Sequence, residues 1–367
     1  MAKVQAAVAT AAHAPFEVRD LELDALRPDE VRVRMAASGV CHTDAITRDG
    51  YAPIQMPAVL GHEGAGVVDA VGEAVSTVAP GDHVVLSFAH CGVCAQCRKG
   101  RPAYCSDLFG RNFTGARLDG SRAFSENGTE VSSHFFGQSS FASMSNVAER
   151  SVVKVRDDVP LELLGPLGCG IQTGAGAVLN ALDPPAGSSL AVFGAGAVGG
   201  AAMLGALVAG CTTVIAVDVV DSRLDLAREL GATHAVNAAK EDPVEAIAAI
   251  TGGGVDYAVE TSAVPAVLRQ AADALGVGGT VALVGAQPAD AETAFNTGAS
   301  LLKGWSLRTV IEGDAVPQLF IPEMIDLWQA GRFPFDALVE TYDLDDVNRA
   351  FGDSEEGRTI KPVLRFA

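Results

Sequence analysis

The feature that most constrains this fold is a glycine-rich turn at residues 194–199, Gly-Ala-Gly-Ala-Val-Gly. An apolar run of strand length, residues 190–193, precedes it, and a small-residue stretch of helical length, 200–209, follows it. A second β-rich run, 212–217, then ends at Asp218. This order predicts a strand, a tight turn, a helix and a parallel strand closed by an acid.

Each glycine of this turn has a physical role. Gly194 allows the sharp turn, Gly196 lets backbone N–H groups approach a pyrophosphate, and Gly199 lets helix and strand pack closely. The following helix N-terminus offers unpaired N–H donors to phosphates. The Asp218 carboxylate can accept hydrogen bonds from free ribose hydroxyls and repels a 2′-phosphate, so the unit is predicted to bind NAD in preference to NADP.

The pattern around the turn predicts a doubly wound parallel sheet. Apolar strand-length runs alternate with helical segments from residue 161 to about 309. Strands are expected at 190–193, 213–217, 234–236, 256–260, 280–284 and 306–310. Helices are expected at 197–209, 222–230, 243–250 and 265–275. Strands joined by crossover helices make an α/β fold.

The first part of the chain is β-rich instead. Short runs at 31–35, 66–72 and 83–88 lie between glycine-rich turns, which favours an antiparallel barrel or sandwich. The polar, glycine-rich stretch 105–144 is interpreted as a long loop that wraps the surface near a cysteine cluster, or as a loosely ordered insertion.

The end of the chain is mixed and is expected to return to the first domain. A helix is predicted at 317–330 despite Pro322, and strands at 338–342 and 362–366 flank a helix at 344–351. The predicted domains are 1–160, 161–305 and 306–367. The exposed strand 306–310 could extend the sheet across a two-fold axis, so a homo-oligomer is expected, either a dimer or a tetramer.

Composition narrows the function classes. The 367 residues carry a formal charge of −19, which disfavours nucleic acid and anionic membrane surfaces as partners. The sequence shows neither a transmembrane run nor a signal peptide, so a cytoplasmic protein is expected. Seven cysteines, an odd number, favour metal ligands or free thiols over disulfides.

Four of these cysteines form a compact motif. Cys91, Cys94, Cys97 and Cys105 supply four thiolates, enough to close a tetrahedral zinc site of structural type. An iron–sulfur cluster is the first alternative, but its common bacterial run has a shorter final gap followed by proline, and Ser106 stands here. The second alternative is a nucleic-acid-binding zinc ribbon, which the negative net charge of the chain disfavours.

A second ligand set is dispersed along the chain. Cys41, His62 and Cys169 would give an open zinc site with one free coordination position. Spacing alone supports this weakly, but glycines flank both His62-Glu63 and Cys169, so the backbone can crowd a ligand there. Cys211 has no such context and is interpreted as a core thiol.

Over essentially its whole length the chain resembles the zinc-dependent medium-chain alcohol dehydrogenases. The motifs that carry the resemblance are the glycine turn, the four-cysteine motif, Ser38-Gly39-Val40-Cys41-His42-Thr43-Asp44, Gly61-His62-Glu63-Gly64-Ala65-Gly66, and Gly168-Cys169-Gly170 with Thr173-Gly174. Segments 134–141 and 313–318 make it most similar to the aryl (benzyl-type) alcohol dehydrogenases. The resemblance implies a Rossmann domain and a mostly antiparallel, GroES-like catalytic domain.

The resemblance also implies roles at the zinc site. Cys41, His62 and Cys169 would bind a catalytic zinc, and the four-cysteine motif a structural one. Asp44 would orient His62, Glu63 would assist ligand exchange, and Thr43 would contact the substrate oxygen. Many relatives place a proton-relay histidine three residues after the hydroxyl residue. This sequence has Ile46 there, so the proton would leave through the cofactor ribose or through His42.

Further residues would contact NAD. Gly194, Gly196 and Gly199 form the turn. Thr173, Val198 and Val284 would position the nicotinamide, His42 and Lys361 would meet the pyrophosphate, and Arg223 would flank the adenosine ribose beside Asp218.

The function implied is interconversion of primary, aryl-type alcohols and aldehydes by hydride transfer to NAD. Candidate pocket walls are Phe88, Phe113, Phe135 and Phe141, and Ser87 occupies a position that is often aromatic in relatives. A glutathione-dependent formaldehyde dehydrogenase and a non-catalytic dinucleotide-binding relative are the alternatives.

Overall fold

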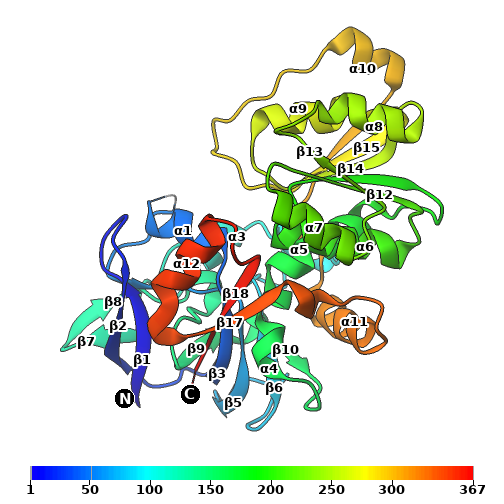
Figure 1. Cartoon of the computed structure of the whole chain (residues 1–367). Coiled ribbons are helices and arrows are strands. Elements are labelled where there is room, and N and C mark those ends of the chain that lie inside the picture. The colour runs from blue at the N-terminus through cyan, green and yellow to red at the C-terminus, as the bar shows by residue number, and fades with distance from the viewer. Residues whose placement is uncertain (1, 51, 367) are drawn as a thin grey trace. The chain divides into compact units, whose positions relative to one another are not determined.

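The computed structural model describes residues 2–50 and 52–366, which divide into two compact units (Figure 1). The first unit holds the described residues of 1–169, 316–325 and 339–367, and the second holds 170–315 and 326–338. The chain therefore passes from one unit to the other after Cys169, and its last residues return to the first unit.

The first unit is built from two sheets. One has the strand order β4-β1-β2-β7-β8: Ala58–Val59, Ala2–Ala9, Phe16–Leu23, Phe124–Glu126 and Thr129–Val131. The other has the order β10-β6-β5-β3-β18-β17: Val152–Val155, His83–Leu86, Gly64–Val71, Glu30–Gly39, Lys361–Arg365 and Val339–Asp343. Strand β9 (Met144–Ala148) also pairs with β3. These ladders are antiparallel except β17–β18, which confirms the mostly antiparallel fold class.

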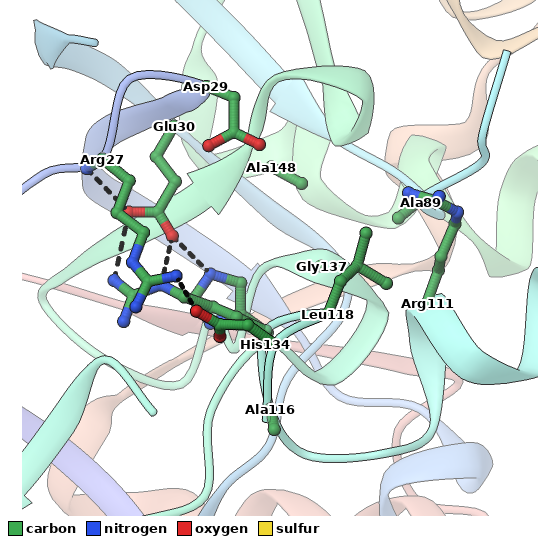
Figure 2. A pocket seen from close by; sticks show the side chains of 12 residues that line it. Arg27, Asp29, Glu30, Ala89, Arg111, Ala116, Leu118, His134, Gly137 and Ala148 are labelled. Carbon is green, nitrogen blue, oxygen red and sulfur yellow. Dashed lines mark hydrogen bonds and ion pairs between the residues drawn. The ribbon is translucent and has the colours of Figure 1, made fainter. Parts of the chain in front are cut away.

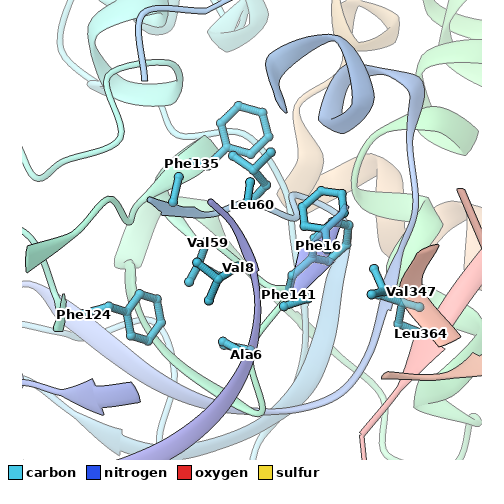
Figure 3. Packing of buried hydrophobic residues seen from close by; sticks show 14 of the residues in the cluster. Ala6, Val8, Phe16, Val59, Leu60, Phe124, Phe135, Phe141, Val347 and Leu364 are labelled. Carbon is cyan, nitrogen blue, oxygen red and sulfur yellow. The ribbon is translucent and has the colours of Figure 1, made fainter. Parts of the chain in front are cut away.

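Aromatic side chains from both ends of the chain share the core of this unit (Figure 3). The Phe16 ring stacks on Phe351 of helix α12 (Val347–Glu355) at 4.9 Å between centroids and meets the edge of Phe141 at 5.9 Å. Burying such rings is worth several kcal/mol, so α12 is held against the first strands. Phe135 and Phe141, two of the candidate pocket walls, are completely buried in this cluster.

The stretch 105–144 is not the surface loop that the sequence suggested. It contains helix α3 (Leu108–Asn112), the β7–β8 hairpin and a 3₁₀ helix (Phe135–Gly137), and every residue from 131 to 142 is buried. The prediction of a surface loop is wrong for residues 131–142, because the polar side chains there form hydrogen bonds inside the protein. For example, the Ser139 hydroxyl donates to the Val59 carbonyl at 2.6 Å.

The second unit contains the predicted parallel sheet. Its order is β13-β12-β11-β14-β15-β16: His234–Asn237, Thr213–Asp218, Ser189–Phe193, Val255–Glu260, Leu275–Leu283 and Ser306–Thr309. All neighbouring strands pair in parallel, which confirms the doubly wound class. The helices around it are α5 (Gly170–Gly176), α6 (Ala197–Ala209), α7 (Asp221–Glu229), α8 (Pro243–Thr251), α9 (Pro265–Asp273) and α10 (Thr297–Lys303).

The remaining helices are short or connect segments. They are α1 (His42–Arg48), α2 (Ala95–Arg98), α4 (Leu161–Leu164) and α11 (Pro317–Gln329). Helix α10 was not predicted, whereas α11 forms around Pro322 as expected. Within residues 2–50 and 52–366, no helix combines the length and apolar character needed to cross a bilayer.

A buried charged cluster ties the 113–134 segment to the start of β3. The Glu30 carboxylate is 3% exposed, accepts hydrogen bonds from Arg117 at 2.6 and 3.1 Å, and lies 3.0 Å from His134 Nε2 (Figure 2). Arg117 also pairs with Asp24 at 2.9 Å. A cavity of about 220 Å³ borders this cluster, and its lining includes Arg27, Arg117 and His134. Burial raises the pKa of Glu30, but the hydrogen bonds from His134 and Arg117 outweigh it and lower the pKa to about 2.

This cluster makes stability depend on pH. The folded-state pKa of about 2 lies below the ordinary value of 4.5, so the stabilisation is fully present above 4.5 and is lost as pH falls toward 2. Replacing Glu30→Gln should lower the free energy of unfolding by about 3 kcal/mol near neutral pH and by much less near pH 3. Urea unfolding at a series of pH values measures this difference.

The matched control is Glu130→Gln, since the Glu130 side chain is 65% exposed and pairs with Arg122 at 3.2 Å. Its effect should stay within about 0.5 kcal/mol at every pH. An equal loss for Glu30→Gln at both ends of the pH range would contradict the role assigned to the cluster.

Candidate active site

The four predicted structural ligands come together in the first unit. The Sγ atoms of Cys91, Cys94, Cys97 and Cys105 all lie within 4.8 Å of one another. The Cys91 sulfur accepts hydrogen bonds from the backbone N–H groups of Val93 (3.4 Å) and Cys94 (3.2 Å), and these bonds lower its pKa. Such a set of thiolates fits a closed tetrahedral zinc site.

The dispersed ligand set also converges in the first unit. Cys41, His62, Glu63 and Cys169 each place a donor atom within 4.8 Å of the others. Cys41 precedes α1, the His62-Glu63 pair precedes β5, and Cys169 follows a 3₁₀ helix (Gly165–Gly168). The Cys169 thiol and the Lys361 ammonium lower the pKa of Cys41, which favours the thiolate form that binds metal.

The imidazole of His62 provides the test of whether a metal fits. The ring is completely buried, and Nδ1 lies 3.0 Å from Asp44 Oδ1. In the described part of the chain, Nε2 has no hydrogen-bond partner. This buried nitrogen, which lies beside two cysteine sulfurs and has no hydrogen-bond partner among the described residues, matches the donor set of an open zinc site.

Asp44 does more than orient His62. Its carboxylate is completely buried, Oδ1 also accepts the Gly61 N–H at 3.0 Å, and Oδ2 accepts the Cys41 N–H at 3.1 Å. One side chain therefore ties together the backbone segments that carry two of the ligands, as well as the imidazole itself.

Lys361 lies beside the metal-type cluster. Its buried Nζ is 2.9 and 3.0 Å from the two oxygens of Glu63 and donates to the Val40 carbonyl at 3.1 Å. Burial would lower the pKa of Lys361, but the Glu63 carboxylate outweighs burial and raises it above the ordinary value. The sequence did not predict this pair, and the contact of Lys361 with a pyrophosphate stays a prediction.

Helix α1 carries the remaining candidates of this site. Thr43 Oγ1 lies 3.7 Å from Cys41 Sγ, so the hydroxyl sits next to the ligand set. His42 is exposed and Ile46 is half-buried. Position 46 thus offers no group that could accept a proton.

The sequence did not predict several contacts of His62. The ring stacks on Phe136 at 4.4 Å between centroids and meets Phe135 edge-on at 5.3 Å. Gln138 donates to the His62 carbonyl at 2.9 Å. All three lie in segment 134–141, which the family resemblance singled out without indicating these contacts.

The glycine turn of the second unit has the predicted geometry. Gly194 has φ +98° between β11 and α6, and a Cβ on Gly199 would lie 1.7 Å from the Gly194 carbonyl oxygen. Asp218 Oδ2 accepts the Ala195 N–H at 2.7 Å and lies 3.9 Å from Arg223 Nη1. Both predicted ribose-binding side chains therefore lie at the turn.

The predicted nicotinamide contacts lie on nearby elements of the second unit. Thr173 is on α5, Val198 is in the first turn of α6, and all three of Thr173, Val198 and Val284 are half-buried. The α5 and α6 backbones touch, because a Cβ on Gly174 would lie 2.0 Å from the Val198 carbonyl oxygen. Val284 follows β15 and donates its N–H to the Glu260 carbonyl.

Comparison with known proteins shows the family of this chain. The family model of the alcohol dehydrogenase GroES-like domain matches residues 27–157, and that of the zinc-binding dehydrogenases matches 197–330. The chain is 48% identical to the geraniol dehydrogenase of Castellaniella defragrans over 99% of this chain and 97% of that protein. This chain belongs to the zinc-dependent alcohol dehydrogenases.

Solved structures of related alcohol dehydrogenases have the same fold. The benzyl alcohol dehydrogenase of Acinetobacter calcoaceticus matches with a TM-score of 0.97 and 49% identity, covering 100% of both chains. An alcohol dehydrogenase zinc-binding domain protein from Burkholderia ambifaria matches with a TM-score of 0.98 and 55% identity, covering 100% of this chain and 99% of that one.

The two ligand clusters predict two zinc ions per chain. Cys169→Ala should remove one ion, because it takes a donor from the open site, and Cys97→Ala should remove the other. Elemental analysis of the purified protein with native mass spectrometry counts the ions.

The matched control is Cys211→Ala, a buried thiol in the core of the second unit, which should keep both ions. Wild-type protein with a single ion that Cys169→Ala does not remove would refute the open site.

Proposed function

We propose that this dehydrogenase interconverts primary, aryl-type alcohols and their aldehydes with NAD as hydride acceptor. The observation that carries the proposal is the buried His62 Nε2 without a partner in the described residues, beside the sulfurs of Cys41 and Cys169. The glycine turn with Asp218 supplies the matching cofactor site.

The residues of the first unit have distinct roles in this proposal. Cys41, His62 and Cys169 would hold a zinc ion, which would supply the Lewis acidity that lowers the pKa of an alcohol hydroxyl, and a bound NAD would be the hydride acceptor. The Thr43 hydroxyl takes the alcohol proton at Oγ1, and its place 3.7 Å from Cys41 Sγ supports this role. Asp44 holds the His62 ring, and Glu63, balanced by Lys361, assists ligand exchange.

The proton then needs an exit. Ile46 supplies no acceptor, so we propose that Thr43 releases its own hydroxyl proton as it takes that of the alcohol. The acceptor would be His42, which is exposed on the same helix, or the ribose of a bound cofactor. Exposure lets His42 exchange protons with water.

The second unit is proposed as the NAD-binding domain. Gly194, Gly196 and Gly199 would cradle the pyrophosphate, and the predicted pyrophosphate contacts of His42 and Lys361 are kept as part of the proposal. Asp218 and Arg223 flank the adenosine ribose, and Thr173, Val198 and Val284 position the nicotinamide.

A primary alcohol with a large apolar body is supported by two relatives, and the narrower aryl preference is supported by the benzyl alcohol dehydrogenase among them. Geraniol and benzyl alcohol, named for two relatives, are primary alcohols with large apolar bodies. A glutathione adduct carries carboxylates and needs cationic side chains to bind it. The formal net charge of −19 disfavours such a substrate for this chain.

We also propose a cytoplasmic homo-oligomer. Every residue of the edge strand β16 is exposed, and a second copy could continue the sheet there. Val277, Leu301 and Leu302 are each more than 80% exposed on neighbouring elements of the same unit, which is unusual for a free surface.

Turnover of an alcohol panel with NAD and NADP tests the function. We expect benzyl alcohol with NAD to give the highest kcat/KM, with ethanol and the glutathione adduct of formaldehyde far lower. Preference for the glutathione adduct would favour the formaldehyde dehydrogenase alternative. Absence of turnover in a protein that holds two zinc ions would favour the non-catalytic one.

Asp218→Asn tests the cofactor assignment. It removes the charge that repels a 2′-phosphate but keeps an oxygen for the Ala195 N–H. The ratio of kcat/KM with NAD to that with NADP should fall by about tenfold or more, equivalent to ~1.4 kcal/mol. Asp221→Asn, an exposed neighbour paired with Lys240, serves as control and should leave the ratio unchanged. An unchanged ratio in Asp218→Asn would remove Asp218 from cofactor selection.

A further inference from the structure

A buried chain of hydrogen bonds connects the segments that carry His62 and Cys169. We propose that Gln138 and Ser87 are positioning residues that set the spacing between these two zinc ligands. The inference rests on the proposed zinc-dependent function and adds residues that do not touch the metal themselves.

Gln138 is the first member of this chain. Its side chain is completely buried, and Nε2 donates to the His62 carbonyl at 2.9 Å and to the Ser87 carbonyl at 3.2 Å. Its Oε1 accepts the Gly64 N–H at 3.2 Å. The Gln138 amide therefore forms hydrogen bonds to the residues before and after Glu63. It also connects them to Ser87, which follows the end of β6.

Ser87 is the second member. It is 1% exposed, and its hydroxyl donates to the Gly168 carbonyl at 2.6 Å, one residue before Cys169. The backbone contact is close, because a Cβ on Gly168 would lie 1.9 Å from the Leu86 carbonyl oxygen. The connection therefore runs from His62 through Gln138 and Ser87 to Gly168.

The need for such a connection follows from the origin of Cys169. This ligand follows a 3₁₀ helix (Gly165–Gly168), so no strand ladder fixes its position against β5. Asp44 already links Cys41 to His62. Zinc tolerates only small errors in ligand distance, and hydrogen bonds to the residues around a site commonly change metal affinity by 10–100-fold. Gln138 and Ser87 add a hydrogen-bonded connection to the segment of the third ligand, beside the backbone contact of Gly165 with the Glu63 carbonyl.

The amide is itself held in place by its turn. Phe136 and Ser139 adopt left-handed backbone angles, with φ +53° in each, and the Ser139 hydroxyl is bonded to Val59. Non-glycine residues adopt such angles only where the surroundings enforce them. The turn thus presents Gln138 in one orientation.

The test uses Gln138→Met and Ser87→Ala in the full-length protein. Gln138→Met keeps the length of the side chain and loses all three hydrogen bonds, and Ser87→Ala removes only the hydroxyl. We expect zinc loss from the Cys41–His62–Cys169 site to a chelator to be faster by about tenfold or more in each variant. After cobalt substitution, the thiolate-to-cobalt bands of this site should shift, while the ion of the four-cysteine site is retained.

Asn112→Leu is the matched control. Asn112 is an equally buried amide with the same pattern, accepting the Ala89 N–H and donating to the Ala89 and Leu108 carbonyls. It should reduce thermal stability comparably without changing the cobalt bands or the zinc loss of the Cys41–His62–Cys169 site.

The outcomes separate this inference from the proposed function. Wild-type protein without zinc at the Cys41–His62–Cys169 site would refute the function itself. Wild-type protein with that zinc, whose loss rate and cobalt spectrum are unchanged in Ser87→Ala and Gln138→Met, would overturn the positioning role alone. Equal effects in Asn112→Leu would also overturn it, because general destabilisation would then explain the loss. If Gln138→Met does not fold, the zinc loss rate and the cobalt spectrum of Ser87→Ala alone decide whether the positioning role holds.

Discussion

The ligand set of the first unit depends on the buried carboxylate of Asp44. Burying a polar side chain away from solvent is costly unless it is hydrogen-bonded. Asp44 meets this condition with the Cys41 and Gly61 N–H groups and the His62 ring. Because these partners come from two separate segments, satisfying the carboxylate also brings two of the proposed zinc ligands together. The stability of the fold and the geometry of the site therefore rest on the same contacts.

The second unit uses a similar device at its glycine turn. Asp218 Oδ2 accepts the Ala195 N–H, and Oδ1 accepts those of Val219 and Val220. The carboxylate thereby connects the end of β12 to the turn after β11. In both units a buried acid forms hydrogen bonds that order a loop carrying proposed site residues.

Much of the fold and of the ligand set could be predicted because their signals are local. The alternation of strands and helices around Gly194 depends on short-range periodicity, and the parallel sheet formed as expected. Segment 131–142 was misjudged, because its serines, His134 and Gln138 have the composition of an exposed loop. Their partners, such as the Val59 carbonyl for Ser139, lie far away in the sequence, and no local pattern shows that they will be satisfied.

The sequence by itself determined the kinds of donor atoms, the glycine turn and the acid that closes it, since these depend on residue type and short spacing. Only the tertiary structure decided how the donors meet. It brought Cys169 to His62, paired Lys361 with Glu63, and placed Gln138 and Ser87 between two ligand segments. Each of these contacts joins distant parts of the chain, and it forms because a buried polar group must find a partner when the surrounding apolar core closes.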